Sequence, residues 1–136
     1  MGWTYQLRGA LQRGILPGGG AALLTCRPVL HRMAQEAGDL DERMAYRILC
    51  RALEEPTRAI LRNAGYDVEP IIRQITTAGS AFDVRCGQIT DMAIAGVLDS
   101  ASVVMSAVRE AITIAALALT VEVLVHHRNP ITSVNP

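Results

Sequence analysis

The chain has 136 residues, half of them hydrophobic but only 4% aromatic, and thirteen basic residues balance thirteen acidic ones. Because a chain without net charge has no general attraction for polyanions, the composition argues against binding to nucleic acid or to acidic membranes. All thirteen basic residues are arginine, which excludes a Walker-type phosphate loop, a Schiff-base lysine and a lysine general base.

The N-terminal part predicts helices on either side of a glycine turn. Thr4 to Arg13 has apolar residues in a polar background and is expected to be the end of a helix. Gly14 to Leu24 reads GILPGGGAALL, in which a proline and three glycines form a turn and alanines and leucines then favour helix. Apolar residues recur at three- and four-residue spacing from Ala21 to Ala37, which predicts one helix, kinked at Pro28.

The sequence in the middle of the chain predicts a long helical stretch and indicates where it begins and ends. Asp39 is a preferred N-cap residue, and Glu42 stands three residues later as its partner in a capping box. Pro56 should bend or divide the stretch, since proline removes a backbone donor. Gly65 suits a left-handed C-terminal cap, so we expect the helical stretch to end there.

Shorter elements follow, and then one final helix. Asp67 to Gly79 predicts a short helix, and β-compatible residues among recurring glycines from Ser80 to Leu98 predict a small hairpin or loop. Asp99-Ser100 should cap a long apolar helix, which we expect to be the central and most buried one. Val121 to His126 alternates like a strand, and residues 129–136 read as an irregular tail.

These elements predict a single domain over residues 1–136 that is mainly α and multihelical, with a small β hairpin and a C-terminal strand. No secretory signal is recognisable. The longest apolar run, between Glu110 and Glu122, is about half of the roughly 20 residues that a bilayer crossing requires, so we expect no membrane span. Three widely spaced cysteines without a C-x-x-C pair fit a reducing, cytoplasmic location.

Four segments occur in the order found in the group I chaperonins, the GroEL family. They are the glycine run Gly14 to Leu24, RALEEP at Arg51 to Pro56, NAG at Asn63 to Gly65, and GVLD at Gly96 to Asp99. The chain resembles that family from about Gly9 to His127. The resemblance corresponds only to the C-terminal half of the family's equatorial domain, which implies a chaperonin role in protein folding or assembly.

The resemblance implies a partial site for ATP or ADP. Gly18, Gly19 and Gly20 match the glycine turn near the ribose, and Gly19 is the expected contact because a side chain there would hold the nucleotide away. Asp99 matches the aspartate that binds the ribose hydroxyls, and a carboxylate can accept two such hydrogen bonds. From the residues alone, Asp99 as a helix N-cap is an equal alternative.

The resemblance also places the base-binding segment at Asp83, Val84 and Arg85. The family prefers small residues where this chain has Arg85. A guanidinium there could stack on adenine, or it could fill the space and exclude the base.

The family's phosphate chemistry is not expected from this chain. Its catalytic aspartate corresponds to Gly2, and its phosphate loop and metal-binding aspartate belong to the N-terminal half of the domain. We therefore assign no catalytic residue and no metal ligand, and predict negligible ATPase activity for the chain alone. Magnesium would bind only if a partner supplied its ligands.

Other candidate residues have simpler interpretations. His126-His127 is expected to be solvated tail rather than a metal ligand, and Cys86 is expected to be a packed or idle thiol. Glu54 and Glu55 are interpreted as charges on a solvated helix face.

The expected partners follow from the missing half of the domain. Helices that should pack against it would leave apolar surface for self-association, for other chaperonin-like chains, or for client proteins in a larger assembly. The alternative is a helical interaction module that has lost nucleotide binding.

Overall fold

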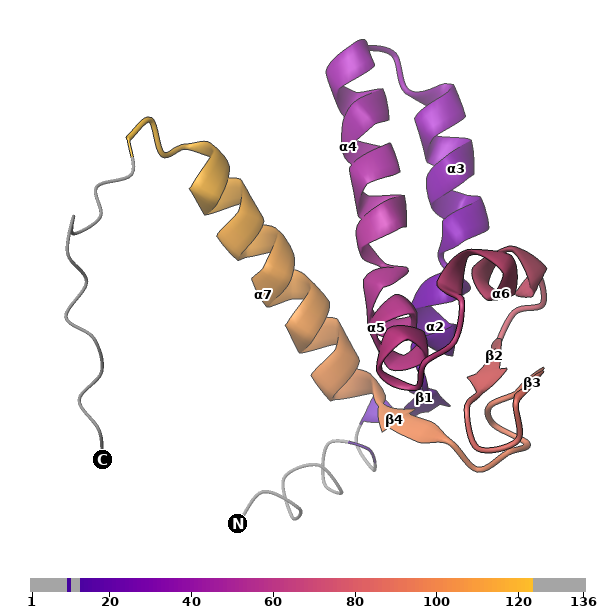
Figure 1. Ribbon diagram of the computed structural model, residues 1–136. Coiled ribbons are helices and arrows are strands. Elements are labelled where there is room, and N and C mark those ends of the chain that lie inside the picture. Colours follow the sequence, from indigo (N-terminus) through magenta and orange to yellow (C-terminus); the bar gives the residue numbers. More distant parts are fainter. Residues whose placement is uncertain (1–9, 11–12, 124–136) are drawn as a thin grey trace, which may run out of the picture. The chain divides into compact units, whose positions relative to one another are not determined.

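A computed structural model describes residue 10 and residues 13–123 of the chain. The chain divides into two compact units, with the boundary in the sequence between Val104 and Met105. Helices form most of the described part, which confirms the mainly α fold (Figure 1). The elements in chain order are β1 (Ile15–Pro17), α2 (Ala21–Leu24), α3 (Arg27–Glu36), α4 (Leu40–Ala52), α5 (Glu55–Asn63), α6 (Val68–Gln74), β2 (Ser80–Asp83), β3 (Gln88–Asp91), β4 (Leu98–Ser100) and α7 (Ala101–Leu119).

The predicted helix from Ala21 to Ala37 is two helices. Pro28 lies in the first turn of α3, where its missing N–H needs no partner. The expected kink at Pro28 is therefore wrong: the break comes before the proline, between α2 and α3. The N-cap at Asp39 is confirmed, because its carboxylate accepts a 2.7 Å hydrogen bond from the backbone N–H of Glu42. α3 and α4 form an antiparallel pair (Figure 1).

Pro56 divides the next stretch in the same manner, since it lies in the first turn of α5. Gly65 ends α5 with a φ of 79°, and the N–H of Tyr66 donates to the carbonyl of Leu61 at 3.0 Å. The predicted C-terminal cap is confirmed. The main core cluster lies where α2, α5 and α6 meet, and its buried members are Leu24, Leu61, Ile72 and Ile75.

The predicted hairpin is confirmed as β2 and β3, in antiparallel register from Ser80 opposite Asp91 to Asp83 opposite Gln88. A second antiparallel pair, β1 with β4, was not predicted, and it sets Leu16 opposite Asp99. Each of its strands has three residues, too few for an alternating pattern to be visible in the sequence.

α7 begins at Ala101, directly after the predicted Asp99-Ser100 pair. Ala101 is its one buried residue, so the central position of this helix stays a prediction. By length and composition α7 could cross a bilayer, with a mean hydropathy of 1.7, a property that core helices of soluble proteins share. Residues 121–123 are not in a strand. The rest of the expected C-terminal strand, the tail 129–136, His126-His127 and nearly all of Thr4 to Arg13 lie outside the described residues.

The glycine turn is closely packed by the protein itself. A Cβ at Gly18 would lie 3.0 Å from the side chain of Val97, and one at Gly20 would overlap the hydroxyl of Thr57. Gly20 also has a φ of 81°, which a side chain disfavours. Gly19 differs, because a Cβ there would meet only the Met92 sulfur at 3.7 Å.

We expect Gly20→Ala to destabilise the fold more than Gly65→Ala. Both positions have a positive φ, which costs roughly 1–3 kcal/mol with a side chain, but Gly65 has no neighbour within 4 Å of a Cβ. Urea unfolding gives the free energy of unfolding of both variants, and the difference between them measures the cost of the overlap with Thr57. Equal free energies of unfolding would show that Thr57 does not restrict the turn.

Candidate functional site

The β1–β4 pair brings the glycine turn next to Asp99. The turn, Gly18 to Gly20, directly follows β1, and Asp99 is the middle residue of β4. The N–H of Gly18 donates to the carbonyl of Val97 at 2.8 Å, which continues the pairing beyond the strands. Two groups that lie far apart in the sequence are therefore neighbours, as the family resemblance implies.

Thr57 holds the turn from the protein side. Its hydroxyl donates to the carbonyl oxygen of Gly19 at 3.0 Å, and its side chain is buried. The N–H of Ala21 donates back to the carbonyl of Gly18 at 3.1 Å, so the start of the four-residue helix α2 is tied into the turn. The sequence analysis missed Thr57, since a single threonine after proline carries no pattern.

Asp99 is exposed, and no hydrogen bond of its carboxylate occurs within the described residues. It lies in β4 rather than directly before α7. At the helix start, the hydroxyls of Ser100 and Ser102 are 2.9 Å apart. Among the described residues the Asp99 carboxylate thus has no hydrogen-bond partner, and Asp99 lies in β4 two residues after Val97, which pairs with Gly18.

Within the predicted base-binding segment, Asp83 and Arg85 bind each other. The Asp83 carboxylate accepts from the Arg85 N–H at 2.9 Å and from the guanidinium Nη2 at 3.0 Å. These bonds hold the pKa of the Asp83 carboxyl down to about 2. Val84 packs against the main core cluster. Phe82, the residue before Asp83, packs edge-on against Tyr66 with ring centroids 4.7 Å apart.

The hairpin separates this unit from the glycine turn. The open end of the hairpin, at Ser80 and Asp91, lies next to the turn, since the following residue, Met92, is buried with Ala21. Asp83 is at the opposite end, three residues or roughly 10 Å along the strand. The structure thus brings together the glycines and Asp99, and sets Asp83, Val84 and Arg85 apart from them.

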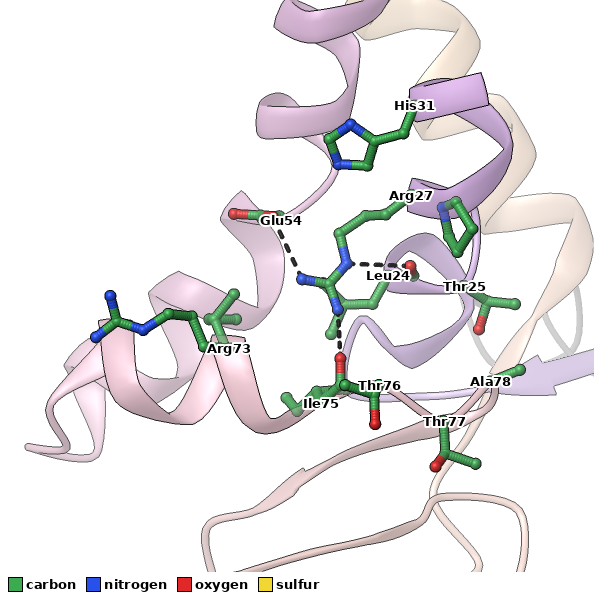
Figure 2. A pocket seen from close by; sticks show the side chains of 12 residues that line it. Leu24, Thr25, Arg27, His31, Glu54, Arg73, Ile75, Thr76, Thr77 and Ala78 are labelled. Atoms are coloured by element: carbon green, nitrogen blue, oxygen red, sulfur yellow. Dashed lines mark hydrogen bonds and ion pairs between the residues drawn. The ribbon is translucent and has the colours of Figure 1, made fainter. Parts of the chain in front are cut away.

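A cavity of about 450 Å³ lies elsewhere, and none of the predicted site residues lines it. Figure 2 shows Arg27 reaching across it from α3. The guanidinium donates to the carbonyl of Ile75 at 2.6 Å and to that of Leu24 at 3.3 Å, and its Nη1 lies 3.4 Å from Glu54. Because these protein groups occupy all its nitrogens, Arg27 braces the elements around the cavity.

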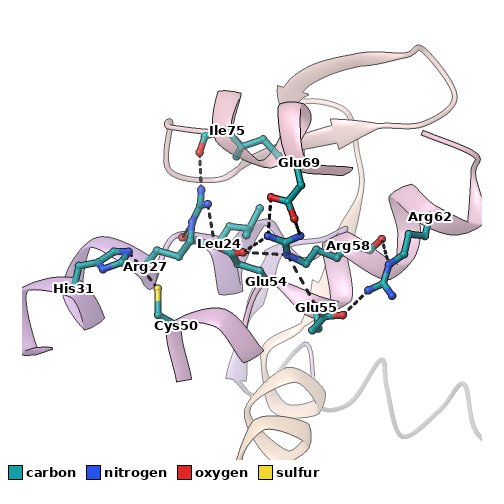
Figure 3. A network of polar contacts seen from close by, with 10 residues as sticks. All are labelled: Leu24, Arg27, His31, Cys50, Glu54, Glu55, Arg58, Arg62, Glu69 and Ile75. Atoms are coloured by element: carbon teal, nitrogen blue, oxygen red, sulfur yellow. Dashed lines mark hydrogen bonds and ion pairs between the residues drawn. The ribbon is translucent and has the colours of Figure 1, made fainter. Parts of the chain in front are cut away.

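Arg27 belongs to a network of charged groups that joins α3, α5 and α6 (Figure 3). Its centre is Arg58, 8% exposed, which contacts Glu54 at 2.9 Å and also Glu69. The hydrogen bond with Glu69 raises the pKa of Arg58 and lowers that of Glu69. The prediction of a solvated Glu54 is wrong, because its side chain is only 15% exposed and bonds both arginines.

One part of this network was readable in the sequence. Glu54 and Arg58 stand four residues apart, the spacing at which charges meet on a helix. Glu69 lies on the next helix, so its contact with Arg58 depends on how α5 and α6 pack.

The comparisons with known proteins agree with this fold. Residues 6–129 match the model of the TCP-1/cpn60 chaperonin family, and the chain therefore belongs to that family. It is similar to "Chaperonin GroEL 1" of Rhodopirellula baltica, with 37% identity over 119 residues, or 85% of this chain and 21% of that protein.

Among solved structures, the fold is similar to the open-state monomer of a group II chaperonin from Methanococcoides burtonii. The TM-score is 0.71 at 21% identity, over 79% of this chain and 28% of the other. The chain thus spans only 21% to 28% of the length of these proteins. Membership of the family is shown, and the assignment to group I stays a prediction.

We expect Arg58→Ala to lower the free energy of unfolding by about 2 kcal/mol, because it removes the shorter of the two ion pairs of Glu54 and leaves only the one with Arg27. The matched control is Arg62→Ala. Its pair with Glu55 is exposed on both sides and should contribute less than about 1 kcal/mol. Chemical unfolding of both variants checks this difference, and similar losses would contradict the central position of Arg58.

We expect Arg85→Ala to raise the pKa of the Asp83 carboxyl from about 2 toward its ordinary value of 3.8. A depressed pKa stabilises the fold above pH 4, and this contribution disappears as the pH falls toward 2. The stability difference between the wild type and Arg85→Ala should therefore vanish at low pH. Carbon-13 NMR titration of the Asp83 carboxyl gives the pKa directly, and an unchanged value in the variant would refute the pairing.

Proposed function

We propose that the chain acts in protein folding or assembly as half of a chaperonin equatorial domain, and that it keeps the sugar side of an ATP or ADP site. The observation that carries this proposal is the β1–β4 pairing, which sets the glycine turn beside Asp99. The similarity to a GroEL protein supports a role as a chaperonin. As part of this proposal, we assign the chain to the group I chaperonins.

In this proposal Asp99 binds the ribose. Its exposed carboxylate has no partner within the described residues, and two oxygens suit two neighbouring hydroxyls. Gly19 lies where the sugar approaches. A Cβ at Gly19 would be in ordinary contact with the Met92 sulfur at 3.7 Å, so side-chain packing does not require this glycine as it does Gly18 and Gly20, although its φ of 65° also favours glycine.

Arg85 is the proposed base contact, so the base would lie toward the far end of the β2–β3 hairpin, roughly 10 Å along the strand from the glycine turn. Asp83 holds the guanidinium by its edge, and the side chain of Arg85 is still 68% exposed. A guanidinium fixed by its edge keeps its flat faces available for stacking on adenine. The pair therefore favours stacking over the alternative in which Arg85 excludes the base.

The chain is proposed to bind nucleotide without hydrolysing it. Phosphoryl transfer depends on metal ions and charged groups around the γ-phosphate, and the residues gathered at the glycine turn supply neither. Magnesium and the phosphate loop would come from a partner, either a second copy or another chaperonin-like chain in the cytoplasm.

A second candidate function is a helical interaction module that binds no nucleotide. It is favoured by one observation: Val97 and Thr57 fill the space at Gly18 and Gly20, so the protein's own packing requires these two glycines. In this case Asp99 has no ligand, and self-association is the function.

Calorimetric titration of the chain with ATP and ADP distinguishes these functions. We expect saturable binding by the wild type and a roughly ten- to hundredfold loss in Asp99→Ala, since two hydrogen bonds to a charged group are removed. Asp67→Ala is the matched control, because Asp67 is also exposed and its side chain caps no helix.

Light scattering on the same samples gives the oligomeric state. A defined oligomer that binds neither nucleotide would reject the half-site and support the interaction module. Equal losses in Asp99→Ala and Asp67→Ala would also count against the half-site, because they would reflect net charge alone.

A further inference from the structure

A second group of polar side chains lies along the seam between α3 and α4. His31 and Gln35 are one helical turn apart on α3, and Arg43 and Arg47 are one turn apart on α4. Residues at this spacing share a helix face. The four side chains line a cleft of about 390 Å³, together with the buried Ala34. None of them belongs to the proposed nucleotide half-site.

The two arginines of this cleft are not neutralised. Four other arginines, Arg27, Arg58, Arg62 and Arg85, form ion pairs with carboxylates. Within the described residues, Arg43 and Arg47 form no such pair, and neither do Arg13, Arg32, Arg51, Arg73 and Arg109. What distinguishes Arg43 and Arg47 is that they line one cleft together. The one hydrogen bond found for them is a long one, 3.5 Å from Arg43 to the carbonyl of Ala37.

Of the three acidic residues within four positions of Arg43, Asp39 and Glu42 have partners of their own, and Asp41 does not line the cleft. The Asp39 carboxylate accepts the N–H of Glu42 at the start of α4, and the Glu42 carboxylate accepts the hydroxyl of Tyr46 at 3.3 Å. Like charges four residues apart destabilise a helix, so Arg43 and Arg47 together oppose the folding of α4. An anion bound between them would remove this repulsion.

The α3 side of the cleft adds two polar side chains, those of Gln35 and His31. The Gln35 side chain carries an amide N–H₂ group. One ring nitrogen of His31, Nε2, lies 3.4 Å from the sulfur of the buried Cys50 (Figure 3). This contact fixes the imidazole at the edge of the cleft, and burial raises the pKa of the Cys50 thiol, which keeps that neighbour uncharged.

We propose that this cleft binds a compact phosphate anion of the pyrophosphate class. Guanidinium groups bind phosphate oxygens in pairs, and two arginines one turn apart can each hold one phosphoryl group of such an ion. Ala34 is the only apolar residue that lines the cleft, and two of its other lining residues are arginines, so charge rather than apolar surface dominates it. The free ion and the phosphate chain of a nucleotide share this chemistry.

Calorimetric titration with sodium pyrophosphate at constant ionic strength tests the proposal. We expect saturable binding by the wild type, and a loss of at least about tenfold in the Arg43→Gln/Arg47→Gln variant, where two charge-assisted contacts are removed. The matched control is Arg32→Gln, which removes an equal charge per residue on α3 without lining the cleft. It should change the affinity by less than about twofold.

Parallel titrations distinguish free pyrophosphate from the phosphate chain of a nucleotide as the ligand. They also distinguish this cleft from the proposed nucleotide half-site at Asp99. In Asp99→Ala, pyrophosphate should bind as in the wild type even if ATP binding is lost. If ATP binds at this cleft through its phosphates, it displaces pyrophosphate there while AMP does not. If Asp99→Ala still binds pyrophosphate, the cleft is supported even when the variant, or the wild type, binds no ATP.

Two outcomes would overturn the proposal. One is the absence of saturable pyrophosphate binding by the wild type, and the other is an equal loss in Arg32→Gln, which would reflect net charge alone. Far-ultraviolet circular dichroism verifies that the double variant is folded, and removing the like-charge pair should leave its helix content unchanged or higher. If the double variant is unfolded, backbone NMR of the wild type decides: shifts at Ala34 and Gln35 support the cleft, and their absence rejects it.

Discussion

The antiparallel pairing of β1 with β4 is the constraint on which the candidate site depends. It joins the first and last parts of the described residues of the larger unit through a few backbone hydrogen bonds, and the Gly18 N–H extends it to the glycine turn. Without this pairing, Asp99 and the glycines would have no fixed relation. The turn is held from a second direction by the Thr57 hydroxyl, so both a strand and a helix determine its position.

Local features of the fold could be predicted because their causes are local. The Asp39 cap, the Gly65 end and the β2–β3 hairpin each depend on residues a few positions apart, and all three are confirmed. Pro28 was placed correctly in a helix but given the wrong effect. The sequence shows that proline removes a donor, whereas only the position of the helix start decides whether that donor was needed.

Contacts between distant segments were the part that residue patterns could not supply. The β1–β4 strands are too short to show alternation, and the contacts of Arg58 with Glu69 and of Arg27 with Glu54 join different helices. For the site, the family motifs pointed to the glycines and Asp99, which the β1–β4 pairing brings into the same part of the fold. They could not show that Asp83 is already bound to Arg85, because that pairing depends on a residue at which this chain departs from the family pattern.

The separation of β1 from β4 along the chain also has a consequence for the order of folding. The α3–α4 pair and the β2–β3 hairpin close short loops, whereas β1 can meet β4 only after the whole chain from Pro17 to Leu98 has been brought together. The entropy lost on closing a loop increases with its length, so this pairing should form late. The glycine turn and Asp99 would then become neighbours only in a chain that has nearly finished folding, and an incompletely synthesised chain could not present them together.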